Sequence, residues 1–241
     1  MFLRLRQLCL VARDLEPVVD DLRAVFGLEV CHRDPAVERF GLHNALLRVG
    51  ASFVEVVAPL RDGTAAGRYL ERRGGDGGYM VILDCPDLAP WRAHVASLGV
   101  RVAASLKAGN YEGLQLHPQD TGGALLEINR TEGGDALLGA YAPAGPHWQD
   151  APAGGSLAAI TGAVLQSASP SRLAERWSRI LMRPALPADG GFEIRLDNAR
   201  LAFVEPRDER GEGLAAIEVE AADPARVAAL ARARYRAAAD G

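Results

Sequence analysis

The run Arg13-Asp14-Leu15-Glu16-Pro17 returns later in the chain as Pro86-Asp87-Leu88-Ala89-Pro90. The copies share the pattern Asp-Leu-x-Pro, and Asp87 lies 73 residues after Asp14. Each copy follows an apolar run typical of a strand, at residues 8–12 and 80–83. Each is expected to begin a helix, with Asp as the N-cap and Pro in the first turn. Self-similarity at a fixed offset indicates a repeated supersecondary unit.

The residues after each copy extend the repeat. Each helix is expected to end at a glycine, Gly27 or Gly99, and a short strand-like run follows at 28–31 or 100–102. Two further strand-like runs come next, at 44–49 and 52–58 in the first copy and at 113–117 and 124–129 in the second. A connecting helix is expected over 65–73. The pattern therefore predicts an α+β fold of tandem βαβββ units.

The rest of the chain contains a weaker copy of the unit. Residues 131–156 are rich in Gly, Ala and Pro and are interpreted as a surface linker. Beyond them we expect a strand at 159–166, a helix at 169–181 and strands at 192–196 and 200–204. A last strand at 214–219 and a helix at 225–239 begin a fourth unit that stops there. The predicted domains are 1–130, the linker 131–156, and a degenerate or truncated second domain, 157–241.

Composition excludes several classes of protein. Of 241 residues, 49% are hydrophobic and 24% charged, with a formal net charge of −4, as in ordinary soluble domains. The basic stripe of a nucleic-acid binder is missing, and the apolar runs are too short for a membrane span or a signal peptide. We therefore expect a cytoplasmic protein. The three cysteines are odd in number and form no CxxC pair, which favours small buried residues over a disulfide framework.

Two stretches resemble a known superfamily. The run Leu116-His-Pro-Gln-Asp-Thr-Gly-Gly-Ala-Leu-Leu-Glu127 is similar to the final hairpin of glyoxalase-like and methylmalonyl-CoA epimerase-like proteins. The run Ser52-Phe-Val-Glu-Val-Val-Ala-Pro59 is similar to the last strand of their first unit. Over residues 3–130 the chain thus resembles the vicinal-oxygen-chelate (VOC) superfamily, which includes the glyoxalases and bleomycin-resistance proteins. The resemblance implies a curved mixed sheet forming a cup, with the active site inside it.

In that superfamily, metal ligands come from the first and last strands of each unit. The resemblance places them here at Gln7, Glu55, Glu127 and Met80, or at Gly78 if the strand is shifted by two residues. Three of these positions offer oxygen to a divalent ion such as Mn, Co, Ni, Zn or Mg, whereas a thioether is a poor ligand for hard ions. Metal-binding members usually have histidine at the Met80 position.

Other roles follow from the same cup. Glu127 and Glu55 lie in apolar runs, where an unpaired carboxylate is costly to bury, and both are candidate catalytic groups. Each could instead pair with an arginine at the rim. Gln7, which is expected to share one strand face with Leu5 and Cys9, could be a satisfied polar core residue. The candidate substrate-binding residues are His43, Asn44, Tyr79, Met80, Tyr111 and His117, with capping of the hairpin as the alternative for His117.

Two functional hypotheses remain open. The first is a metal-dependent isomerase, epimerase or lyase in which the ion stabilises an enolate-like anion and a carboxylate moves the proton. The second is a metal-free protein that sequesters a small molecule in the same cup, as bleomycin-resistance proteins do. Both predict a small-molecule partner and neither a nucleic acid nor a membrane. A homodimer is compatible with both.

Overall fold

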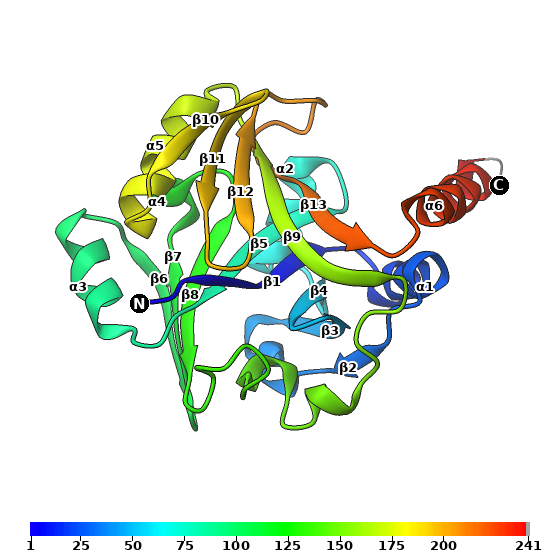
Figure 1. Cartoon of the computed structure of the whole chain (residues 1–241), viewed down its shortest axis with the longest axis horizontal. Helices are drawn as coiled ribbons and strands as arrows, with labels where there is room; N and C mark the ends of the chain where they lie inside the picture. Colours follow the sequence, from blue (N-terminus) through cyan, green and yellow to red (C-terminus); the bar gives the residue numbers. More distant parts are fainter. Residues whose placement is uncertain (240–241) are drawn as a thin grey trace.

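A curled eight-stranded sheet forms the first half of the molecule (Figure 1). The computed structural model describes residues 1–239, with side chains described as far as Arg232. The first unit consists of β1 (Arg4–Val11), α1 (Leu15–Phe26), β2 (Val30–His32), a 3-10 helix (Pro35–Phe40), β3 (Leu42–Val49) and β4 (Ser52–Pro59). After α2 (Ala65–Arg73), the second consists of β5 (Gly77–Asp84), α3 (Ala89–Ser97), β6 (Val102–Ala108), β7 (Tyr111–Leu116), the short α4 (Pro118–Thr121) and β8 (Leu125–Thr131).

The strand order confirms the repeat. It runs β2-β3-β4-β1-β5-β8-β7-β6, so the second unit reverses the order of the first. In each unit the last strand lies parallel to the first, and β1 and β5 join the units as an antiparallel pair. This arrangement gives the predicted α+β fold with tandem βαβββ units.

Two irregularities in the β1–β5 pair control which side chains face the cup. The pairing skips Arg6 between Leu5 and Gln7, and it skips Tyr79 between Met80 and Gly78. An extra residue of this kind is a β-bulge and re-aims the side chains beside it. As a result, Leu5 belongs to the core behind the sheet while Gln7 lines the cup. The expectation that Leu5 and Gln7 share one face is therefore wrong.

The helix ends are set by glycine more than by the predicted aspartate caps. α1 ends at Gly27, whose φ of 69° is left-handed. Asp14 occupies the N-cap position of α1 without a side-chain hydrogen bond. At α3 the N-cap is Leu88, and Asp87 instead accepts a hydrogen bond from the Ala89 N–H at 2.9 Å. The predicted helix positions hold. Asp14 is the N-cap of α1 as predicted, although its side chain makes no capping hydrogen bond, whereas the prediction of Asp87 as the N-cap of α3 is wrong.

A second, five-stranded sheet follows with the order β10-β11-β12-β9-β13. Its elements are β9 (Leu157–Gln166), α5 (Pro170–Leu181), β10 (Ala185–Ala188), β11 (Gly191–Arg195), β12 (Arg200–Val204), β13 (Gly213–Ala221) and α6 (Pro224–Ala239). The third unit therefore has all its strands. The sequence did not reveal β10 because Pro187 lies in it, and proline is tolerated mainly in edge strands such as this one. The fourth unit consists of β13 and α6.

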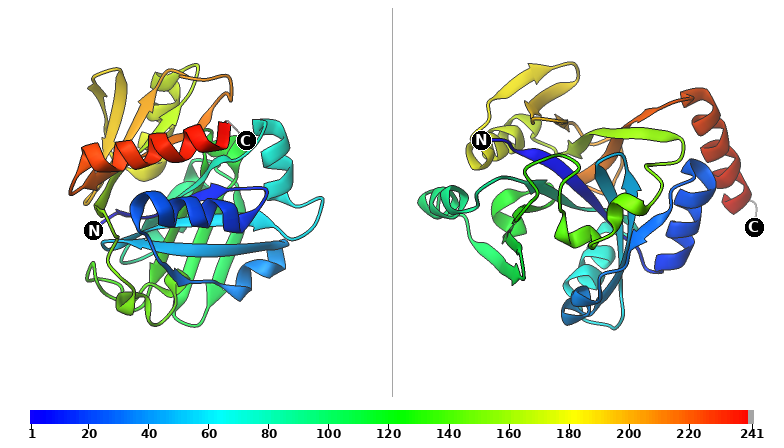
Figure 2. Two further views of the ribbon diagram at one scale, coloured as in Figure 1. Left: turned by 90° about the vertical axis from the view of Figure 1, so that its right-hand side faces the viewer. Right: turned by 60° about the horizontal axis from the view of Figure 1, so that its bottom comes forward.

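The second sheet packs behind the cup. One buried cluster contains residues of both sheets, including Leu8 and Val81 of the first and Leu165 and Phe203 of the second. α6 lies beside α1, as Figure 2 shows. Burial of this shared apolar surface holds the two sheets together. Within residues 1–239, no helix has the length and apolar character needed to cross a membrane.

The segment between the sheets is more than the expected surface linker. It buries Tyr141 and Trp148 against Phe53, whose ring lies 5.2 Å from each of theirs. Arg48 donates hydrogen bonds to the carbonyls of Gln149 and Ala151 at 2.7 and 2.6 Å. The segment therefore closes one end of the cup.

Trp177 on α5 provides a test of the contact between the halves. Its ring is fully buried, packs edge-on against Phe203, and donates from Nε1 to the carbonyls of Thr121 and Gly122. We expect W177A to lower the free energy of unfolding by about 3–5 kcal/mol because it leaves a cavity. W177F should cost less, since it removes mainly the hydrogen bonds.

Urea unfolding followed by circular dichroism measures both variants, with L186A at the partly exposed Leu186 as the control. The control should change stability by less than about 0.5 kcal/mol. Equal losses in W177A and L186A would contradict the role assigned to Trp177.

Candidate functional site

The concave face of the first sheet lines a cavity of about 1170 Å³. Side chains from both units reach it, among them Gln7, Asn44, Glu55, Tyr111 and Glu127. Apolar side chains occupy much of the wall, so a few polar groups stand out against an apolar background. A concave, mostly apolar site with convergent polar groups is the usual form of a small-molecule site.

Glu55 is buried on β4 and faces this cavity. Its two oxygens accept hydrogen bonds from Gln7 Nε2 at 2.5 Å and from Asn44 Nδ2 at 2.7 Å. Burial raises the pKa of Glu55, although the hydrogen bonds from Asn44, Cys9 and Gln7 oppose this shift. The negative charge of Glu127 raises the pKa of Glu55 further, so the two acids interact.

Glu127 occupies the equivalent strand of the second unit and is only 3% exposed. It accepts hydrogen bonds from the Tyr111 hydroxyl, from Gln115 Nε2 at 2.9 Å and from Asn129 Nδ2 at 3.0 Å. All three donors are neutral. Among the described side chains, neither acid has the arginine partner that the rim alternative required.

A chain of polar contacts crosses the floor between the acids. The Tyr141 hydroxyl donates to Gln7 Oε1 at 3.1 Å, and Gln7 in turn donates to Glu55. The charge of Glu127 raises the pKa of Tyr141. Asn129, which is hydrogen-bonded to Tyr141, also donates a hydrogen bond to Glu127. Gln7 is therefore a hydrogen-bonded bridge between Tyr141 and Glu55.

Most of the predicted substrate-binding residues line the cavity. These are Asn44, Tyr79, Met80, Tyr111 and His117. His117 also caps α4 by accepting a hydrogen bond from the Gln119 N–H at 3.3 Å, so the same residue caps the helix and lines the cavity.

Two predicted positions lie elsewhere. His43 does not line the cavity, because alternation along β3 directs Leu42 and Asn44 into the cup and His43 away from it. Gly78 lies on the back of the sheet, where an added Cβ would come within 2.4 Å of the Leu214 carbonyl oxygen. The bulge at Tyr79 is the reason, so the alternative ligand position at Gly78 is wrong.

The side chains at the expected metal position do not fit a hard divalent ion. Glu55, Glu127 and Gln7 supply oxygens, but each of these oxygens already accepts a hydrogen bond from a neutral donor. The fourth position is the thioether of Met80. No group of three His, Cys, Asp or Glu side chains within the described residues could hold a metal ion. A hard divalent ion would have to displace these donors and would gain no histidine.

Sequence reasoning missed three residues of the hydrogen-bond network around the acids. Gln115 and Asn129 hold Glu127, and their places opposite and two residues beyond it on the β7–β8 ladder could have indicated this. Tyr141 comes from the segment interpreted as a linker. Nothing in its local sequence indicates a contact with Gln7, because only the docking of the segment brings them together.

Acidic and basic side chains occupy different parts of the cavity. Its floor contains the two acids, whereas Arg39, Arg68 and Arg72 line it and are themselves exposed. Glu212, from the loop before β13, also lines the cavity and accepts a hydrogen bond from the Gly123 N–H at 2.9 Å. The second sheet therefore contributes to the site as well as supporting it.

Comparison with solved structures shows the same cup elsewhere. A methylmalonyl-CoA epimerase solved with methylmalonyl-CoA and NH4+ is 25% identical, with a TM-score of 0.50; the match covers 54% of this chain and 96% of the epimerase. A variant of the Streptomyces coelicolor methylmalonyl-CoA epimerase solved with 2-nitronate-propionyl-CoA is 25% identical, with a TM-score of 0.50 and coverage of 58% and 100%. No curated protein matches the chain.

The family model of a glyoxalase-like domain matches residues 8–181. The match spans well over half of the chain, including both units of the cup, the segment that closes it, and the start of the third unit. It agrees with the strand order and with the resemblance of residues 3–130. The chain therefore belongs to the glyoxalase-like domain family, within the VOC superfamily.

Proposed function

We propose that this protein is an isomerase, most simply an epimerase, that moves a proton on a small oxygenated carbon acid held between Glu55 and Glu127. The observation that carries the proposal is the pair of buried carboxylates at matching positions of the two units, both lining one cavity. Burying two interacting acids costs free energy, and arrangements of this kind are typical of functional sites.

The proton transfer assigns a role to each acid. One carboxylate breaks the C–H bond by taking the proton, and the electron pair left behind is delocalised onto the neighbouring carbonyl oxygen as an enolate. The other acid returns a proton to the carbon. We assign the base to Glu127, which three neutral donors hold, and the proton donor to Glu55, whose pKa is raised. The reverse reaction exchanges the two roles.

Two further observations support this assignment. The structural neighbours described above are epimerases by their titles, and one is bound to methylmalonyl-CoA, an ester with an acidic C–H bond beside carbonyl groups. The exposed arginines that line the cavity would attract a substrate with an anionic group. Because the oxygens at the expected metal position are already hydrogen-bonded, the proposed reaction uses no metal ion.

The second candidate function is sequestration of a small molecule. The observation that favours it is Met80, which stands where metal-binding relatives usually have histidine and adds apolar surface to a large cavity. A binding protein would hold the same compounds without exchanging their protons. A measurement of proton exchange therefore distinguishes the two candidate functions.

We expect the protein to exchange the acidic C–H proton of methylmalonyl-CoA, or of a simpler 2-oxo or 2-hydroxy acid, with deuterium from D2O. E127Q should slow the exchange on the order of 100-fold or more, because the amide cannot take the proton. Proton NMR measures the rate. E132Q, at an exposed glutamate just beyond β8, is the matched control and should exchange at the normal rate. Binding without exchange across this panel would favour sequestration.

The raised pKa of Glu55 also predicts how stability depends on pH. The folded protein holds the Glu55 proton more tightly than the unfolded chain, so this residue makes folding more favourable as the pH falls. The effect begins at the raised folded pKa and is complete below the unfolded value of about 4.3.

E55Q should remove this part of the pH dependence. We expect the stability of wild type relative to E55Q to rise as the pH is lowered through this window, measured by urea unfolding at a series of pH values. A difference that stays constant, or that shrinks at low pH, would show that Glu55 does not carry the raised pKa.

Metal removal tests the metal-free reaction directly. After treatment with EDTA, the exchange rate should stay within about twofold, because the oxygens of Glu55, Glu127 and Gln7 are occupied by hydrogen-bond donors. Thermal unfolding with added Mn²⁺, Co²⁺, Ni²⁺, Zn²⁺ or Mg²⁺ should show no specific stabilisation. Loss of exchange that one of these ions restores would overturn this part of the proposal.

A further inference from the structure

Tyr141 is an unusual residue of the cavity because the segment between the sheets supplies it. It is 2% exposed, its ring is stacked on Phe53 at an interplanar angle of 9°, and its hydroxyl reaches the cavity floor. Its hydrogen bond goes to a neutral amide oxygen, Gln7 Oε1, at 3.1 Å. The Tyr111 hydroxyl, by contrast, is committed to the carboxylate of Glu127.

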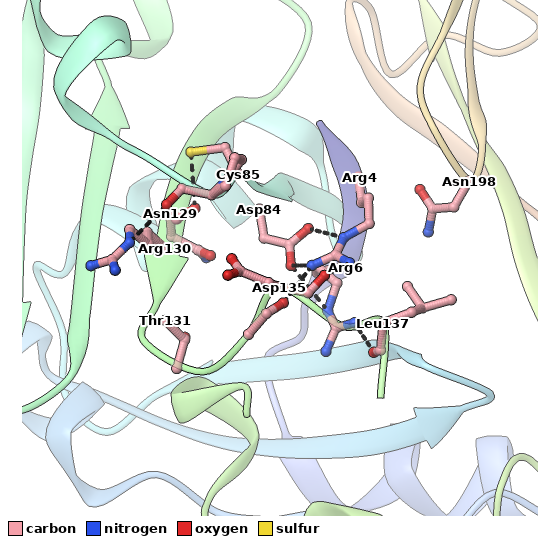
Figure 3. A network of polar contacts seen from close by, with 12 residues as sticks. Arg4, Arg6, Asp84, Cys85, Asn129, Arg130, Thr131, Asp135, Leu137 and Asn198 are labelled. Carbon is pink, nitrogen blue, oxygen red and sulfur yellow. Dashed lines mark hydrogen bonds and ion pairs between the residues drawn. The ribbon is translucent and has the colours of Figure 1, made fainter. Parts of the chain in front are cut away.

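A buried guanidinium lies against the ring of Tyr141. Arg6 is 1% exposed, and its Cζ lies 4.7 Å from the centre of the Tyr141 ring and 5.7 Å from that of Trp148. Arg6 Nη1 donates to the Leu137 carbonyl at 2.6 Å, while Arg6 Nε has no hydrogen-bond partner within the described part of the chain (Figure 3). The bulge in β1 is what places Arg6 and Gln7 on the same side of the sheet.

The carboxylate nearest to Arg6 is already paired with a second arginine. Asp84 is bound mainly by Arg4, at 2.6 Å, and its nearest oxygen lies 3.7 Å from Arg6 Nε (Figure 3). Two buried guanidinium groups thus share one carboxylate. Arg6 is therefore only partly neutralised, and it lies against the Tyr141 ring, where burial strengthens its effect.

These contacts suit a hydrogen-bond donor for a developing anion. We infer that Tyr141, polarised by Arg6, donates its hydrogen bond to the enolate oxygen that forms when the carbon acid loses its proton. This inference rests on the proposed function and names the group that stabilises its anion. Tyr141 keeps its proton throughout and only redirects its hydrogen bond from Gln7 to the substrate, while Arg6 acts through Tyr141 as a positioning residue.

The titration behaviour of Tyr141 is consistent with a donor that stays protonated. Burial raises the pKa of Tyr141 well above its ordinary value, and the charge of Arg6 opposes that rise. The negative charges of Glu127 and Asp84 also raise the pKa of Tyr141. A preorganised donor in a buried site can stabilise an anion strongly because it need not reorient solvent.

The experiment compares two probes that differ by one proton. Propane-2-nitronate carries the negative charge of an enolate, and 2-nitropropane is its neutral form. NMR titration of wild type should show about tenfold tighter binding of the nitronate. Y141F should lose most of this preference while binding 2-nitropropane within about twofold of wild type, because it retains the ring and removes only the hydroxyl.

Two arginine variants test the contribution of Arg6. R6M should also weaken the nitronate preference, and R6K should keep more of it than R6M. R183M is the control: Arg183 also donates a hydrogen bond to a main-chain carbonyl, that of Met1 at 3.3 Å, but it lies in the second half of the chain and does not line the cavity. R183M should leave the preference unchanged. Should R6M fail to fold, Y141F carries the test alone.

Proton exchange completes the experiment. Y141F should lower kcat for exchange on the order of 100-fold with little change in KM. Nitronate preference that depends on Tyr141 without any exchange by wild type would refute the proposed function and support the anion site. Exchange by wild type that Y141F leaves intact, or a wild type without nitronate preference, would overturn the inference.

Discussion

The antiparallel pairing of β1 with β5 is the constraint on which the rest of the structure depends. It joins the two units across a pseudo-twofold relation and brings Glu55 and Glu127 to one cavity. Its two bulges then decide which side chains face that cavity. Without the bulge at Arg6, strict alternation could not place both Arg6, which lies against Tyr141, and Gln7, which lines the cavity, on the same side of the sheet.

Buried acids shape the chemistry of the cavity. Neutral amides and a phenol satisfy the oxygens of both carboxylates, so the acids can be buried without cationic partners. A site of this kind differs from one that awaits a metal ion, in which open oxygens or imidazoles would face an empty centre. In the reaction that we propose, the anion is stabilised in a different way, by hydrogen bonds backed by a buried guanidinium.

The second half of the chain completes the site in two ways. Its sheet packs behind the cup and shares a core with it, which holds the curled sheet in place. The segment that connects the halves closes one end of the cup, and buried arginines bind its carbonyls. Arg73 fixes the loop before β13 in a similar way at the other sheet, and that loop brings Glu212 to the cavity.

Much of this could be predicted from the sequence. The Asp-Leu-x-Pro repeat and the glycines after each helix determine the order of elements and the pairing of equivalent strands, because these signals are local and periodic. The positions of Glu55 and Glu127 in apolar runs indicated inward-facing acids. β10 escaped prediction because an edge strand tolerates a proline that a central strand would not.

Only the tertiary structure decided the rest. A bulge shifts the facing of a strand by one residue and leaves little trace in the sequence, so the exclusion of Gly78 and the placing of Arg6 beside Gln7 depend on the assembled sheet. Tyr141 lies 134 residues from Gln7, and their contact forms only when a segment without regular periodicity docks on the cup. The sequence by itself determined the repeated framework and its two acids, because both are encoded locally. Packing between distant segments determined what surrounds those acids.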